Sequence, residues 1–352
     1  MNILRMILVL LCSVTMAAEK VADLPELAKP ASIVIDSSRL YICDNDTIHM
    51  YGLKPFGYKG KFGRAGEGPG EFNSRPHLAV QADQFFVNTM GKILTFSKSG
   101  EFQGQTKIPF LYFYIYYPLL PVGSNYVGLP LKNIEGTANF IHSVNVYDSK
   151  LTLIKEIYQG PPPQLLPPPR PGAKVVKVDF EVIPDCLETA VQGDRIYVAD
   201  SRKGFFVSVF NESGEHLFDI EKKFMPVKVS QDFKDEFWKE TRSSENWEQL
   251  KQRFNYRIRD AYPAFFSMKI QEQKIYFSTY AQKNDFYEMV VLDLNGEVLN
   301  QAFCFPLHPD TKLLGGIVPF SNEYSIQDDM LYYIALNEET MLFELHSCTI
   351  SD

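Results

Sequence analysis

One short pattern recurs six times along the chain and restricts its possible folds more than any other feature. Each copy is a polar turn followed by an apolar strand with an aromatic or apolar residue in its second place. The copies occupy residues 37–42, 82–87, 123–128, 193–198, 272–277 and 328–333, and their second-place residues are Tyr41, Phe86, Val127, Tyr197, Tyr276 and Tyr332. Self-similarity of this kind indicates an array of structural repeats.

Every copy is followed by further β-rich sequence. The next runs rich in β-formers are 47–51, 92–96, 143–147, 206–210, 289–293 and 341–345. Three of them end in a Gly-Glu turn, at Gly100, Gly214 and Gly296, where glycine supplies the positive φ that a tight antiparallel turn needs. Another strand then follows, so each unit is predicted to be a four-stranded antiparallel meander.

Six such units predict an all-β chain folded as a six-bladed β-propeller. A blade of four strands takes about 40–50 residues, which matches the shorter repeat intervals. The longer intervals contain a proline-rich insertion at 161–171 and a helical insertion at 230–258, in or before the fifth blade. Apolar residues at three- and four-residue spacing indicate the helices, with Ser230 and Ser244 as expected N-caps.

The ends of the chain predict how the ring closes. After the last β-rich run, too few residues remain to form an outer strand for the sixth blade. Residues 19–30 precede the first blade and are free to supply that strand. This closure removes an exposed sheet edge and holds a terminus that would otherwise fray, so we expect it here.

Residues 1–18 have the pattern of a secretory signal peptide. A short region with one positive charge precedes an apolar stretch that ends in small residues, and the stretch is shorter than a membrane span. The mature domain is then 19–352, exported to a periplasm or the extracellular space, without membrane insertion after cleavage. The bulky Leu11 before Cys12 disfavours lipoprotein anchoring.

The net charge restricts the classes of partner that the chain can bind. Removing residues 1–18 takes away one arginine and no acid, so the net charge goes from −8 to −9. An acidic surface repels phosphate backbones, which argues against nucleic-acid binding.

The remaining cysteines, Cys43, Cys186, Cys304 and Cys348, contain no CxxC pair. They are expected to be buried small residues, with a single disulfide left open by the oxidising compartment. We expect a monomer.

The run from Gly63 to Phe72, which contains the motif GxGPGEF, carries a family resemblance. With the Gly-Glu hairpins and the Asp-ended strand at 197–200, it resembles the NHL-type six-bladed propellers of exported bacterial proteins. The resemblance covers the mature chain, but the full motif occurs only once. It implies a binding or scaffolding role, with lactonases and amidating lyases among the relatives. Glu71 is expected to accept backbone N–H bonds between blades.

No linear motif predicts a catalytic or metal site. Pro69 and the missing Lys-Ser/Thr argue against a phosphate loop at Gly66–Gly70. The six histidines show no paired ligand spacing, and the 44–46 loop lacks the glycine and distal glutamate of a calcium loop, which favours turn capping. A GxSxG elbow and an SxxK motif are also missing. We therefore expect no cofactor and assign no metal or catalytic residue.

The aromatic run at 110–117 is the candidate binding element. Read as the innermost strand of the third blade, it places Tyr112, Tyr114 and Tyr116 on one face, where they could stack on a sugar or hold a peptide. Packing between blades is the alternative. The helical insertion has two readings as well, as a lid or partner-binding element over one face or as a cap on exposed apolar surface.

The function predicted from the sequence is a non-catalytic binding module for a protein, peptide or glycan. The alternative is a lactonase-like hydrolase or lyase with a metal-assisted site at the mouth of the channel. Polar residues that converge from separate blades would form such a site, and they leave no linear motif. The sequence favours a protein without catalytic activity, and it does not identify the ligand.

Overall fold

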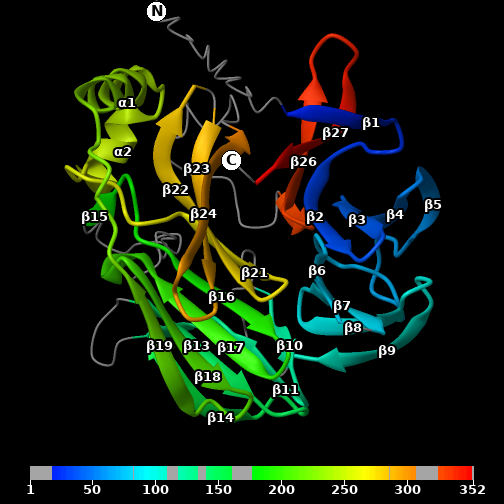
Figure 1. Cartoon of the computed structure of the whole chain (residues 1–352). Coiled ribbons are helices and arrows are strands. Elements are labelled where there is room, and N and C mark those ends of the chain that lie inside the picture. The colour runs from blue at the N-terminus through cyan, green and yellow to red at the C-terminus, as the bar shows by residue number, and fades with distance from the viewer. Residues whose placement is uncertain are drawn as a thin grey trace, which may run out of the picture.

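The computed structural model describes residues 18–81, 83–108, 118–133, 140–160, 177–284, 286–306 and 324–350. Within them, six antiparallel sheets form the blades of a propeller, as the repeats predicted. In Figure 1 the strands β2, β6, β10, β16 and β21 lie towards the middle of the ring. These are the first strands of successive blades, so each blade is built from the inside outwards.

The first three blades follow one another along the chain. Blade one contains β2 (Pro30–Asp36), β3 (Arg39–Asp44), β4 (Thr47–Leu53) and β5 (Phe56–Phe62). Blade two contains β6 (His77–Val80), β7 (Gln84–Thr89), β8 (Lys92–Ser97) and β9 (Phe102–Lys107). Blade three contains β10 (Leu120–Val122), β11 (Asn125–Gly128), β13 (Phe140–Tyr147) and β14 (Leu153–Gln159), and β12 (Leu131–Asn133) also pairs with β13.

The last three blades complete the ring. Blade four contains β16 (Leu187–Gln192), β17 (Arg195–Asp200), β18 (Phe205–Asn211) and β19 (His216–Lys222), with a short 3₁₀ helix, η1 (Ser201–Lys203), after β17. Blade five contains β21 (Ser267–Gln271), β22 (Lys274–Lys283), β23 (Phe286–Asp293) and β24 (Val298–Pro306). Blade six contains β25 (Tyr324–Gln327), β26 (Met330–Asn337) and β27 (Leu342–Thr349).

The N-terminal strand closes the ring, which confirms the predicted closure. β1 (Glu19–Leu24) pairs antiparallel with β27 as the outer strand of blade six, and Leu24 is fully buried. The chain then passes to blade one, where the Asp44 carboxylate accepts hydrogen bonds from the amides of Ala28 (2.8 Å) and Lys29 (2.5 Å). Asp44 therefore caps the connection between the two blades, a segment outside its own loop.

The repeated second-place residues form the core. All six are at most 8% exposed, because the second strand of each blade is covered on both faces by its neighbours. For example, the Tyr41 ring packs edge to face against Phe85, with 4.6 Å between the ring centroids. The Gly-Glu turns have the predicted geometry as well, with positive φ at Gly100, Gly214 and Gly296.

The GPGEF segment is a structural turn between blades one and two. Glu71 accepts a hydrogen bond from the Gly68 amide at 2.8 Å, as predicted, and another from Arg64 Nε at 2.8 Å. A Cβ atom at Gly66 would come within 2.0 Å of the Glu71 carboxylate, so glycine is required there. The motif thus encodes a carboxylate-capped loop.

The insertion lies between blades four and five, as predicted, but it is not wholly helical. α1 (Gln231–Ser243) is capped by Ser230, whose Oγ accepts from the Phe233 amide at 3.1 Å. Ser244 is the C-cap of α1, so its expected role as an N-cap is wrong; α2 (Trp247–Arg253) begins after Asn246. The chain then forms β20 (Phe254–Arg257), which pairs in parallel with β15 (Val178–Glu181). In the described ranges, neither helix has the length and apolar character to cross a membrane.

Candidate functional site

The innermost strands enclose a cavity of about 240 Å³ near the ring axis. Its walls come from five blades, through β2, β10, β16, β21 and β25. Most of the lining is aliphatic, with Ile33, Val34, Ile35, Leu120, Val191, Ile270 and Ile326 among the wall residues. Charged side chains in such a wall therefore need an explanation.

Two side chains of opposite charge type project from this apolar wall into the cavity. Glu188 comes from β16 and Lys269 from the adjacent β21, and both line the cavity. They form no ion pair or hydrogen bond with any residue of the described chain. The Lys269 ammonium lies 4.6 Å from the centroid of the buried Tyr324 ring, which gives it a cation–π contact in addition to the longer-range attraction of Glu188.

Burial shifts both pKa values towards neutrality. Loss of solvent raises the pKa of Glu188 to about 8, and the Lys269 charge only partly opposes this. The same cause lowers the pKa of Lys269 to about 8. At pH 7 the Glu188 carboxyl is therefore mostly protonated while the Lys269 ammonium keeps most of its charge, and a ligand that carries a cation and an anion would favour the charged forms of both.

A third polar group in the wall is also without a partner. The Oγ1 atom of Thr189, next to Glu188 on β16, is buried and makes no hydrogen bond within the described structure. In contrast, Ser325 Oγ in the same wall accepts from the Ile35 amide at 3.0 Å. Buried hydroxyls are normally hydrogen-bonded, so Thr189 is an exception in this wall.

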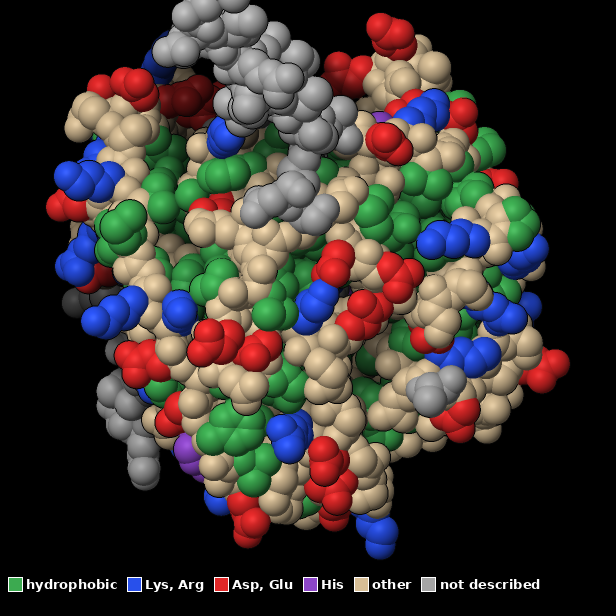
Figure 2. All heavy atoms as spheres, viewed as in Figure 1, with side chains coloured by type: hydrophobic (Ala, Val, Ile, Leu, Met, Phe, Trp, Pro, Cys, Tyr) green, Lys and Arg blue, Asp and Glu red, His purple; other side chains and the backbone are tan. Residues whose placement is uncertain are grey.

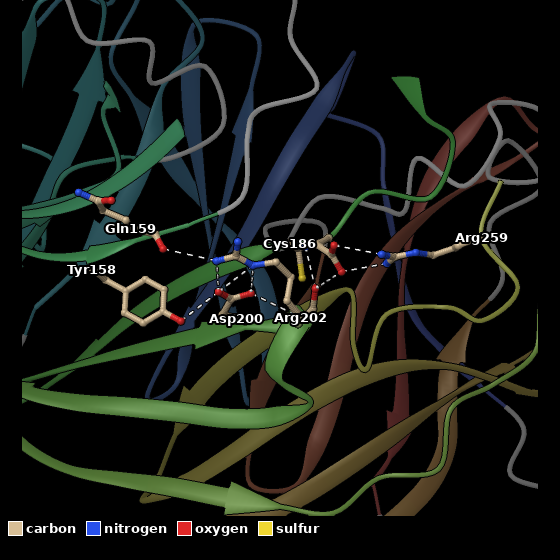
Figure 3. A network of polar contacts seen from close by, with 8 residues as sticks. Tyr158, Gln159, Cys186, Asp200, Arg202 and Arg259 are labelled. Atoms are coloured by element: carbon tan, nitrogen blue, oxygen red, sulfur yellow. Dashed lines mark hydrogen bonds and ion pairs between the residues drawn. The ribbon is translucent and has the colours of Figure 1, made fainter. Parts of the chain in front are cut away.

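A network of ion pairs lies beside the start of β16 (Figure 3). Asp200 is fully buried and accepts three hydrogen bonds from the Arg202 guanidinium, at 2.9 Å, 3.0 Å and 2.5 Å, and one from the Tyr158 hydroxyl at 2.9 Å. Burial opposes ionisation of Asp200, but the Arg202 hydrogen bonds outweigh it and keep the pKa low. These charges are paired, unlike those in the cavity.

A second part of this network connects the insertion to blade four. Arg259, which follows β20, donates to both carboxylate oxygens of Asp185 at 2.9 Å and 3.1 Å. Asp185 also accepts from Ser201 Oγ, and that hydroxyl accepts from the Cys186 amide. Because Cys186 is one residue from β16, the insertion is held close to the strand that carries Glu188.

The Cys186 thiol is not poised for nucleophilic chemistry. It donates to the Phe265 carbonyl at 3.3 Å, and burial raises its pKa well above the usual value. A thiolate nucleophile needs the opposite environment, with nearby positive charge and a low pKa. Cys43, Cys186, Cys304 and Cys348 are all free thiols in this structure.

The tyrosine site predicted from the sequence falls on residues that the structure does not describe. The innermost described strand of blade three is β10, which begins at Leu120, three residues after the 110–117 run ends. The run was assigned because it has the stronger β pattern, whereas β10 is short and contains Pro121. Tyr112, Tyr114 and Tyr116 lie outside the described residues, as does the proline-rich stretch at 161–171, and their role stays a prediction.

Sequence reasoning missed Glu188 and Lys269, although a signal was present. Each is a single charge within a first strand that is otherwise mostly uncharged, LETAVQ in blade four and SMKIQ in blade five. The first strands of blades two and three, HLAV and LPV, carry no acid or lysine.

Among the described residues, no group of three or more potential ligands has the geometry of a metal site.

Comparisons with known proteins identify no family and find only weak structural similarity. No family model matches the sequence, and no curated protein matches it significantly. Structural similarity extends to the Cps50 (Swd1) β-propeller domain of Myceliophteria thermophila, with 9% identity, a TM-score of 0.40, and coverage of 95% of this chain and 100% of that one. Apo AztD from Citrobacter koseri gives 9% identity and a TM-score of 0.40, covering 92% of this chain and 90% of that chain.

A third similar structure is the AfRom2 CNH domain, at 8% identity and a TM-score of 0.36, with 94% of this chain and 98% of that chain covered. These similarities are too low to transfer a ligand or an activity. The blade count rests on the strand pairing itself. The NHL-type resemblance therefore stays a prediction.

Proposed function

We propose that this chain is an exported propeller that binds a peptide or protein partner without converting it, and that the central cavity receives one charged end of that partner. One observation carries the proposal: Glu188 and Lys269 face the cavity without ion-pair or hydrogen-bond partners among the described residues. Buried charges are normally paired, because an unpaired charge in an apolar wall is costly. A partner with both a cation and an anion would satisfy the two side chains together.

The size of the cavity favours a peptide over a glycan. Sites for small organic ligands usually measure about 300–1,000 Å³, and this cavity measures about 240 Å³. By itself it can hold a terminal residue or a side chain, and an adjoining hollow of about 610 Å³ shares Leu120 and Val191 with it and leaves room for the following residues. The remainder of a peptide would extend over the adjoining face, where the insertion and the Asp185–Arg259 pair lie.

Export and a binding role also agree with the sequence. The 1–18 segment has the pattern of a signal peptide, and the resemblance to NHL-type exported propellers implies binding or scaffolding. Tyr112, Tyr114 and Tyr116 lie just before β10, a wall strand of the cavity, so they remain candidates for contacts with the same partner.

The test uses a pool of random hexapeptides with free termini, incubated with the immobilised protein and identified by mass spectrometry. We expect enrichment of peptides with an acidic and a basic group close together at one end. Glu188→Gln/Lys269→Met should abolish the enrichment. The control Glu221→Gln/Lys223→Met removes the same two charge types from exposed positions and should retain it. Equal enrichment by both variants would rule out the cavity as the site.

A second candidate function is acid–base catalysis, and the pKa values of about 8 for both Glu188 and Lys269 favour it. Side chains that titrate near neutral pH can donate and accept protons during turnover. This is a form of the hydrolase or lyase alternative that uses the two cavity side chains. A panel of lactones and nitrophenyl esters tests it: turnover that is lost in Glu188→Gln and retained in Glu221→Gln would identify an enzyme.

A further inference from the structure

A second hollow, separate from the central cavity, lies between the outer parts of blades one and two. It measures about 360 Å³, and its lining includes four cationic side chains, Arg39, Lys54, Lys59 and Lys98, with Ser38 and Ser99 beside them. We call it the basic groove. Figure 2 shows Lys and Arg side chains gathered on the right-hand part of the face in view, over these two blades.

The strand order brings these cations together from separate parts of the sequence. Arg39 begins β3, Lys54 lies in the β4–β5 turn, Lys59 is in β5, and Lys98 follows β8 of the next blade. Gly52 in β4 leaves room for the Lys59 side chain, because a Cβ atom there would lie 3.1 Å from Lys59 Cε. The Lys59 side chain can therefore lie across the hairpin.

Only one of the four charges is neutralised. Lys98 forms an ion pair with Asp36 at 2.5 Å and lies 4.8 Å from the centroid of the Phe85 ring. Arg39 donates from Nη1 to the Lys98 carbonyl at 2.9 Å, which anchors the guanidinium without cancelling its charge. Among the described residues, Arg39, Lys54 and Lys59 have no ion-pair partner.

Three uncompensated cations around one hollow are unexpected on a chain with a net charge of −8. Like charges repel one another, so a cluster of them attracts an anion more strongly than a single cation does. The number of charges distinguishes between anions. A single carboxylate neutralises one cation, whereas a phosphate or sulfate group offers three acceptor oxygens and up to two negative charges to an arginine and two lysines.

We propose that the basic groove binds a phosphate or sulfate monoester group. Arg39, held in place by the Lys98 carbonyl, provides the fork-shaped donor, while Lys54 and Lys59 neutralise the remaining charge. The groove lies at the periphery of the ring and shares no lining residue with the central cavity. It would therefore act independently of the peptide site, on a small phosphorylated compound or a sulfated polysaccharide.

The experiment measures binding of three probes to the purified protein at low salt by isothermal titration calorimetry: inorganic phosphate, glucose 6-phosphate and a sulfated heparin hexasaccharide. We expect saturable binding that weakens as sodium chloride is raised, because the contacts are exposed. Tighter binding of the sugar phosphate would identify a small-molecule site. Tighter binding of the hexasaccharide would identify a polysaccharide site, and either result supports the proposal.

Two double variants with the same change in net charge locate the binding. Lys54→Gln/Lys59→Gln removes two exposed cations from the groove and should weaken binding at least tenfold. Lys107→Gln/Lys223→Gln removes two exposed cations elsewhere and should change it less than twofold. All four lysines are exposed, so both variants should unfold at the wild-type temperature. Absence of saturable binding to every probe, or an equal loss in both variants, would overturn the proposal.

Discussion

Two glutamates, a buried one at the closing seam and a partly exposed one in the wall of the central cavity, differ in how their charges are compensated. Glu344 lies at the closing seam, where its carboxylate accepts from Lys20 Nζ at 2.7 Å and Asn337 Nδ2 at 2.8 Å and contacts His346 Nε2 at 2.9 Å. Glu188, in the wall of the central cavity, has no partner within the described structure. Hydrogen bonds from Lys20 and Asn337 lower the pKa of Glu344 to about 2, while burial raises that of Glu188 to about 8.

The difference separates charges that hold the fold together from charges that are open to a ligand. At the seam the charges satisfy one another, and removing one leaves the others unpaired. In the cavity the charges cost stability, so removing them is expected to stabilise the fold. Functional sites commonly carry such a cost. The two regions should therefore respond to substitution with opposite signs.

The largest expected effect is loss of the seam itself. Deleting β1, residues 19–24, exposes the edge of β27 and removes the buried Leu24. Losing that burial and the strand hydrogen bonds should cost about 5 kcal/mol and lower Tm by about 5–10 °C. Calorimetry measures the change. As a control, Val21→Ala alters the same strand at a position that is 37% exposed and should have little effect. Unchanged unfolding of the deletion variant would show that closure does not hold the ring.

The next effect concerns acid stability at the seam. The pKa of Glu344 is lower in the folded than in the unfolded chain, so its stabilising contribution is full above the unfolded pKa and is lost as pH falls towards 2. Glu344→Gln should lower Tm at pH 7, and this difference from wild type should shrink as pH drops from about 4.5 to 2. Thermal unfolding across this range checks it. Exposed Glu339→Gln is the matched control, and a pH-independent difference would contradict the prediction.

A smaller effect is expected where the insertion meets blade four. Arg259→Met removes both hydrogen bonds to Asp185 and leaves a partly buried carboxylate, at a cost of about 1–3 kcal/mol. The insertion should open more often, which hydrogen exchange of α1 and β20 amides would detect. Arg257→Met breaks the more exposed pair with Asp179, which is worth at most about 1 kcal/mol. Equal exchange in the two variants would mean that Arg259 does not hold the insertion in place.

The smallest effect has the opposite sign. Glu188→Gln/Lys269→Met replaces two partly exposed ionisable side chains, which have no ion-pair partner among the described residues, by neutral groups of similar size, and should stabilise the fold by about 1 kcal/mol at pH 7. Chemical denaturation measures the change. For the exposed pair Glu221→Gln/Lys223→Met we expect a change within about 0.5 kcal/mol. A destabilised cavity variant would place Glu188 and Lys269 with the structural charges, and the comparison with Glu344 would fail.

The two regions also differ in how far the sequence predicted them. The closing strand, the Gly-Glu turns and the Glu71 cap were expected from local patterns, since each depends on residues near one another or on the count of strands. The parallel pairing of β15 with β20 was not expected, because it joins segments on either side of blade four. Ser244 was assigned to the wrong helix end because α1 and α2 are separated by only three residues.

The sequence by itself determined the repeating unit, the number of blades and the way in which the ring closes. These features follow from hydrophobic alternation, turn glycines and chain length, which act over short distances. Only the tertiary structure decided that Glu188 and Lys269 share one wall, and that Arg39, Lys54, Lys59 and Lys98 share one groove. The physical reason is that a propeller brings residues from different blades together through ring closure, and spacing within a blade carries no record of which positions meet.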